Sequence, residues 1–410
     1  MNTIQEKIKK GIIHETDLTR KLTIDGITKI HKVYKVKLDY LYFNDKNDRI
    51  ATWINKYKND NSIKELDKDD KKKYNEIIHG FIFASNPMSM KKTQKNIEMV
   101  EQREPGVILS DGRIIDGNRR VFCLRNLAEK NSKFNYFETV ILDKKLEDNE
   151  KEIKKLELNI QHGEESKIDY NPIDRLVGIH NDIVDNSLLT ITEYANSSNI
   201  GENEIEKLVQ LSNLLVEFLE HINAPKQFYI ARDMDLYGPM VELYGVLKKI
   251  KDEDKIENMK IAAFTNFLMQ PQGDMTRFIR KIKPVATSTY VDEFLEEQLI
   301  LAEEVMDNLE NVRKIDIDVI NKEIRKNEEI RSKLTRSLDK ADIKVKSSET
   351  RERPLKILDK IEDSLTSIDL NIIKKLNKEQ ILSMKNSMEN IDEAIINIKE
   401  AIKNIYNENM

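Results

Sequence analysis

The chain has 410 residues, of which 39% are hydrophobic and 34% are charged, which is enough for two or three domains with real cores. No stretch approaches the roughly 18 to 20 consecutive apolar residues of a membrane helix, and the polar N-terminal segment lacks the apolar core of a signal peptide. A single cysteine, Cys123, excludes an intrachain disulfide. We therefore expect a cytoplasmic protein without a membrane partner. The formal net charge of −5 is uneven: residues 1–150 hold 30 Lys or Arg against 24 Asp or Glu, so a polyanion or nucleotide is expected to bind the N-terminal third.

Residues 31–147 are predicted to form a small α/β domain that follows a polar N-terminal extension at 1–30. Alternating apolar side chains are typical of strands, and apolar side chains three or four residues apart are typical of helices. These patterns predict strands at 31–43 and 135–142 and helices at 47–57 and 93–101. Because strands and helices alternate along this region, we expect one sheet packed against helices.

The most informative stretch is 105–127, which predicts a strand, a tight turn, a second strand, a glycine and a helix. The second apolar run ends at Asp116 and Gly117, and Arg119 and Arg120 follow at the start of the helical pattern. A glycine, backbone N–H groups and two guanidinium groups therefore meet at a helix N-terminus. Such a place suits an anion such as phosphate, so this turn is the strongest candidate for a chemical site.

From residue 148 onward the sequence has almost no strand pattern. We expect a helical domain at 148–285, in which two adjacent helices at 190–219 are separated by a short turn. A helical, coiled-coil-like region is expected at 290–410, with Pro354 interrupting it. The predicted fold class is therefore α+β, with a small α/β domain followed by helical domains.

The last helix has the most regular pattern of the chain. Its apolar residues keep a strict spacing of three and four: Ile381, Met384, Met388, Ile391, Ile395, Ile398, Ile402 and Ile405. Asn377 followed by Gln380 is close to a capping-box start. Such a seam implies coiled-coil or helical-hairpin packing, and both an intramolecular bundle and a homodimerisation arm fit it.

Three segments in this order resemble the ParB N-terminal domain of the ParB/sulfiredoxin-like superfamily. The first is DGRIIDGNRRVFCLRNL at 111–127, and the second is LNIQH at 158–162 followed by NPID at 171–174. The third is the helix pair at 190–219, which resembles the family's helix-turn-helix. The resemblance covers roughly residues 30–245.

The resemblance implies that the domain binds a nucleotide, often CTP with Mg²⁺, and couples it to DNA. Carried over residue by residue, it implies phosphate contacts from Gly117, Asn118, Arg119 and Arg120, a metal contact from Asn159, and Gln161 beside it. Leu158 and His162 stand where the family has Glu and Arg, and Glu157 is expected to point elsewhere on a helix. A missing carboxylate weakens a Mg²⁺ site, so hydrolysis is placed in doubt.

The sequence is compatible with three functions. The leading one is a ParB-like, DNA-associated protein that binds a nucleotide or DNA phosphates and acts in partition, regulation or phage defence. The second is a nuclease or nucleoside triphosphatase that uses Asp116 as a general base or metal ligand, although this residue also fits a turn cap. The third is a non-catalytic structural or adaptor protein whose site has decayed, with which Leu158 and His162 agree. Glu202, Glu204 and Glu206 make the second helix of the pair negative, which disfavours base-specific reading of DNA by it. Cys123 is expected in the core.

Overall fold

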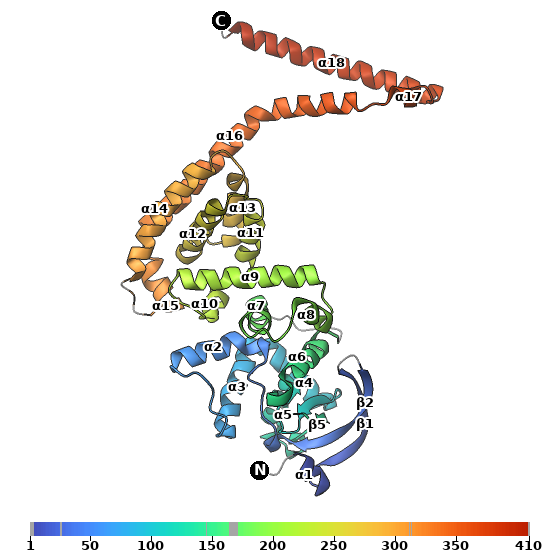
Figure 1. The fold of residues 1–410 in the computed structure, drawn as a ribbon, viewed down its shortest axis with the longest axis vertical. Coiled ribbons are helices and arrows are strands. Elements are labelled where there is room, and N and C mark those ends of the chain that lie inside the picture. Colours follow the sequence, from blue (N-terminus) through green and yellow to red (C-terminus); the bar gives the residue numbers. More distant parts are fainter. Residues whose placement is uncertain are drawn as a thin grey trace. The chain divides into compact units, whose positions relative to one another are not determined.

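A computed structural model gives the fold of the chain (Figure 1). The structure describes residues 4–24, 27–144, 146–163, 171–310, 312 and 314–408. Residues up to Asp342 form one compact unit and residues from Ile343 form a second. Within the described ranges every strand precedes residue 143, and the later elements are all helices, which confirms the predicted α+β class.

The first unit begins with a mixed five-stranded sheet. Its strands are β1 (His14–Ile24), β2 (Ile27–Lys37), β3 (Gly106–Leu109), β4 (Ile114–Asp116) and β5 (Tyr136–Leu142). They lie in the order β1-β2-β5-β3-β4. The central pair β3 and β5 is parallel, and the other neighbours are antiparallel. The order places the turn after β4 at one edge of the sheet.

The segment expected to be an N-terminal extension forms β1 and the first residues of β2. The boundary expected at residue 31 therefore falls inside β2, which pairs with β1 from His14 opposite Lys35 to Ile24 opposite Ile27. β1 is an edge strand in which only Arg20 and Leu22 are buried. A strand that buries so few apolar side chains leaves almost no alternating pattern in the sequence.

Helices cover both faces of the sheet. One face packs against α2 (Ala51–Asp60), α3 (Lys71–Ser85), α4 (Pro87–Val100) and α5 (Asn118–Ala128). The other face packs against α6 (Leu146–Gly163). Phe137 belongs to the core on the first face, as does the buried Cys123, and Val140 belongs to the core on the second. A short helix α1 (Ile4–Lys9) and the 3₁₀ turns η1 (Leu38–Tyr40), η2 (Asp48–Ile50) and η3 (Ser132–Phe134) complete this part.

The rest of the first unit is helical, as expected. Its elements are α7 (Pro172–Ile179), the π-helix η4 (His180–Asp185), α8 (Ile191–Ser198), α9 (Glu202–His221), α10 (Phe228–Asp233), α11 (Tyr237–Leu247), α12 (Glu253–Met269), α13 (Met275–Ala286), α14 (Val291–Glu310), α15 (Ile317–Val319), the π-helix η5 (Ile320–Ile324) and the start of α16 (Glu328–Thr366). A three-residue turn joins α8 to α9, with Asn199 in the left-handed region at φ 54°.

The second unit holds the remainder of α16, α17 (Leu370–Ile373) and α18 (Lys378–Glu408). α16 continues through Pro354, so the expected interruption there is wrong. α18 begins with the predicted capping box, since the Gln380 N–H donates to Asn377 Oδ1 at 2.9 Å and the Asn377 N–H donates to Gln380 Oε1 at 3.1 Å. In the described ranges, no helix combines the length and apolarity needed to cross a membrane.

Candidate functional site

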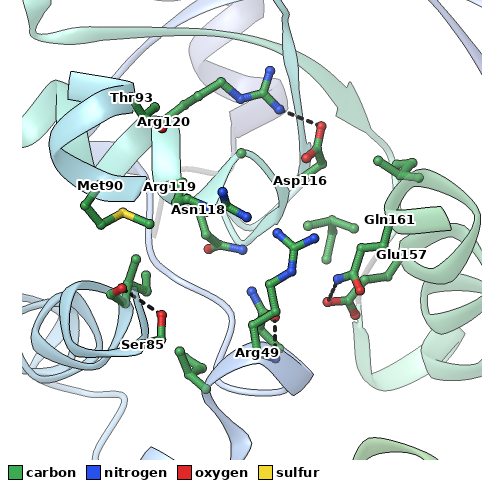
Figure 2. Close-up of a pocket in the computed structure, with 16 residues that line it drawn as sticks. Arg49, Ser85, Met90, Thr93, Asp116, Asn118, Arg119, Arg120, Glu157 and Gln161 are labelled. Carbon is green, nitrogen blue, oxygen red and sulfur yellow. Dashed lines mark hydrogen bonds and ion pairs between the residues drawn. The ribbon is translucent and has the colours of Figure 1, made fainter. Parts of the chain in front are cut away.

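A cavity of about 260 Å³ opens at the N-terminus of α5 (Figure 2). The turn 116–120 forms one wall, and Arg49 from η2 forms another. Glu157 and Gln161 reach it from α6, while the ends of α3 and α4 close the remaining side. The fold therefore brings Asp116, Gly117, Asn118, Arg119, Arg120 and Gln161 together around one cavity.

Gly117 sets the shape of the turn. Its φ is 106°, a backbone angle that residues other than glycine rarely adopt. A Cβ at this position would also lie 2.5 Å from Phe137 Cζ. The first helical hydrogen bond of α5 runs from the Val121 N–H to the Gly117 carbonyl, at 2.9 Å. The backbone N–H groups of 118–120 precede that bond and form the positive end of the helix.

Asn118, the first residue of α5, is only 8% exposed. Its Oδ1 is buried and has no hydrogen-bond partner in the part of the chain that the structure describes. Because the residue lines the cavity, a donor on a bound molecule could satisfy this acceptor.

Asp116 lies in a clamp of two arginines. Its Oδ2 accepts a hydrogen bond from Arg20 Nη1 at 2.7 Å and one from Arg120 Nη2 at 2.8 Å. Both guanidinium groups also donate to the Pro105 carbonyl, Arg20 at 2.7 Å and Arg120 at 3.2 Å. Burial opposes ionisation of Asp116, but Arg120 and Arg20 outweigh it and hold the pKa below its usual value. Such a carboxylate is a weak base, which argues against the catalytic role considered for Asp116.

Two other arginines give the cavity its positive charge. Arg119 Nη1 donates to Ser89 Oγ at 3.2 Å, and Arg49 points from η2 towards the same turn (Figure 2). Burial first, and then the positive charges of Arg49 and Arg120, lower the pKa of Arg119 to about 10. The Arg119 guanidinium therefore stays charged at neutral pH, and an anion between it and Arg49 would relieve their repulsion.

The wall from α6 differs from the prediction. Glu157 is 3% exposed and lines the cavity, and Gln161 Nε2 donates to Glu157 Oε1 at 3.1 Å. The expectation that Glu157 points elsewhere is wrong, because residues four apart share one face of a helix. Asn159, expected near a metal, is not among the residues that line the cavity. Leu158 is buried, and the side chain of His162 lies outside the described residues.

A buried ion cluster holds these walls in place. Lys154 Nζ lies 2.8 Å from both carboxylate oxygens of Asp48 and 3.0 Å from Asp182 Oδ2. Asp48 precedes Arg49, so the cluster ties η2 to α6 and η4 at the point where Arg49 enters the cavity. Burial, followed by the negative charges of Asp48 and Asp182, raises the pKa of Glu157 above its usual range, although Lys154 opposes this.

The donor set does not fit a magnesium ion. Within the described ranges, no three His, Cys, Asp or Glu side chains are grouped so that they could hold a metal ion. Asp116 already binds two guanidinium groups, and the raised pKa of Glu157 disfavours its anion. Mg²⁺ is usually bound through one or two ionised carboxylates together with phosphate oxygens. The cavity therefore offers contacts for phosphate but has no ionised carboxylate that is available to bind the metal.

Comparison with known proteins shows a structural likeness. No family model and no curated protein matches the sequence. A solved structure described as a Pnob8-like ParB-N domain is similar at 12% identity, with a TM-score of 0.37, over 70% of this chain and 98% of that one. The α+β fold class is established by the sheet and helices of this chain itself.

Proposed function

We propose that the cavity at the 116–120 turn binds the phosphate groups of a nucleotide. The observation that carries this proposal is the pair Arg49 and Arg119, two guanidinium groups that converge on the N-terminal end of α5. Guanidinium groups and helix N-termini are both preferred partners of phosphate. The unsatisfied acceptor on Asn118 favours a nucleotide over a bare phosphate, because ribose and base supply O–H and N–H donors.

Binding without turnover is the form of this function that the site supports. Asp116 is held by Arg20 and Arg120, and the described residues lack a Mg²⁺ site, so no observation favours the nuclease or triphosphatase hypothesis. Arg120 would then act mainly by fixing the turn, while Arg119 would contact the phosphate directly.

DNA association is the second part of the proposal, and it rests on the ParB-like resemblance of residues 30–245. A role in partition, regulation or phage defence would follow from nucleotide binding that alters contact with DNA. α9 offers little support for reading bases, because Glu202, Glu204 and Glu206 lie at its start and none of them is buried. We therefore expect any DNA contact to be made through phosphates and to weaken steeply with salt.

Calorimetric titration with CTP, ATP, GTP and UTP, each with Mg²⁺ and with EDTA, tests the proposal. We expect at least one nucleotide to bind, and to bind in EDTA as well. Arg119→Gln should weaken binding by about 10- to 100-fold, the effect of losing one charge-assisted hydrogen bond. Arg103→Gln is the matched control, since Arg103 is exposed and does not line the cavity. No heat with any nucleotide, or an equal effect of both variants, would refute the proposal.

A further inference from the structure

A second cavity of the first unit adjoins the one at the 116–120 turn. Its volume is about 500 Å³, and it lies mainly between η2, the start of α2, α6 and η4. Asn47 and Glu157 line both cavities, so these two residues form part of the wall between them. A recess of this size is within the range of small-molecule sites.

The second cavity has an excess of acidic side chains. Seven Asp or Glu and four Lys side chains line it, whereas three arginines and two carboxyl groups line the cavity at the 116–120 turn. Three of the lysines are partly exposed, and each pairs with one carboxylate, in the pairs Lys46–Glu150, Lys58–Glu65 and Lys226–Asp185. The negative excess therefore lies deeper, around the fourth lysine, Lys154.

At this depth one ammonium group faces three buried carboxyl groups, those of Asp48, Glu157 and Asp182. Lys154 Nζ donates to both carboxylate oxygens of Asp48 at 2.8 Å. Asp182 is 7% exposed, and its Oδ2 lies 3.0 Å from Lys154 Nζ but has no hydrogen-bond partner within the described ranges. Burial raises the pKa of Asp182 to about 7, although Lys154 opposes this. A buried carboxylate in this position would be stabilised by a further cationic donor.

A second acceptor without a donor lines the same cavity. Asn55 Oδ1 is buried and has no hydrogen-bond partner in the part of the chain that the structure describes. An ammonium group suits both acceptors, because it donates three hydrogen bonds and accepts none. A metal ion suits them less well, since no three His, Cys, Asp or Glu side chains among the described residues are grouped to hold one.

Apolar side chains form the rest of the lining. They are Ile54, Ile153, Val177, Leu188 and Phe228. Apolar walls of this kind pack against methylene groups while the charged ends of the same molecule reach polar partners. The cavity therefore combines acceptors for ammonium groups with a surface for an aliphatic chain.

We infer that the second cavity binds an aliphatic di- or polyamine, with one ammonium group between Asp182 and Asn55. A second ammonium group would lie at Asp185, in place of the exposed Lys226 that pairs with it. Exchanging that partner costs little, because exposed ion pairs contribute little to stability. The inference does not depend on nucleotide binding at the 116–120 turn.

Calorimetric titration of the full chain with putrescine and with spermidine, in the absence of nucleotide, tests the inference. About 150 mM NaCl screens attraction of the amines to the exposed surface. We expect at least one amine to bind. Asp182→Asn should weaken binding by about 10- to 100-fold, the effect of losing one charge-assisted hydrogen bond. Asp235→Asn is the matched control, since Asp235 is exposed and does not line the cavity.

Asn55→Asp should change the affinity in the opposite direction. This substitution keeps the shape of the side chain and adds a carboxylate, so we expect it to tighten binding by about tenfold. It also decides the matter if Asp182→Asn does not fold, which the fluorescence of Trp53 on α2 would show.

Three results would overturn the inference. The first is neither heat nor a rise in melting temperature with either amine at about 1 mM. The second is an equal affinity of Asp182→Asn and Asp235→Asn, which would place binding on the general surface. The third is an unchanged or weaker affinity of Asn55→Asp.

Discussion

Replacing Gly117 with alanine should destabilise the first unit strongly. The φ of 106° lies outside the regions that alanine favours, which costs about 1–3 kcal/mol. The added Cβ would stand 2.5 Å from Phe137 Cζ, and overpacking of a core costs about 1–3 kcal/mol more. We therefore expect Gly117→Ala to lower the free energy of unfolding by about 2–6 kcal/mol.

Urea unfolding followed by the fluorescence of Trp53, the single tryptophan, measures this change. Trp53 lies on α2 with the guanidinium group of Arg232 3.9 Å from its ring centre, so its signal reports on the first unit. Gly201→Ala is a matched control, because Gly201 also precedes a helix but has φ −64° and open space around it. A difference below about 1 kcal/mol between the two variants would refute the reasoning.

Three other perturbations test the surroundings of the cavity. Lys154→Met should lower the free energy of unfolding by about 3–5 kcal/mol, because Asp48 and Asp182 would stay buried without their cation. Urea unfolding measures this change, and a free energy of unfolding that stays within about 1 kcal/mol of wild type would contradict it. Asp116 has a lowered pKa in the folded state, so its ion pairs stabilise the fold above the ordinary carboxyl pKa of about 3.9 and are lost as the pH falls further. The stability difference between wild type and Asp116→Asn should thus be constant from about pH 7 to 5 and shrink below about pH 4, and an undiminished difference at about pH 3 would be evidence against it. Cys123 is buried and burial raises its pKa to about 12, so a thiol reagent at about pH 8 should label it only after unfolding, and rapid labelling of the native chain would show that the thiol is accessible.

The sequence predicts the turn well because its signals are local. Glycine at a strand end, followed by arginines and a helical pattern, specifies β4, Gly117 and α5 within a short stretch of chain. The same holds for the start of α18, where Asn377 and Gln380 need only each other. Features built from neighbouring residues can be read from one sequence.

The rest of the site depends on contacts between distant segments. Arg49 reaches the cavity from a 3₁₀ turn far before the α5 N-terminus in the chain, and nothing near it in the sequence indicates this. Arg20 belongs to a strand without a clear pattern, yet it holds Asp116 across 96 residues. The position of Glu157 in the cavity could have been predicted locally, because it stands four residues before Gln161 and so shares its helix face. Alignment with the family's motif, which has its acid at position 158, instead led to the expectation that Glu157 points elsewhere.

The position of Phe137 has a consequence for how the sequence can change. Its ring meets the space that a Cβ would fill at Gly117 and also at Gly106, where that Cβ would lie 2.1 Å from Phe137 Cζ. Side chains at positions 106, 117 and 137 therefore compete for the same space. A smaller residue at 137 would relieve only the ring contact, because a Cβ at Gly106 would still lie 2.7 Å from the Asp116 carbonyl oxygen and Gly117 would keep its φ of 106°. Both glycines should therefore persist in related sequences even where position 137 varies. In a designed variant, the turn could be reshaped only by changing β5 at the same time.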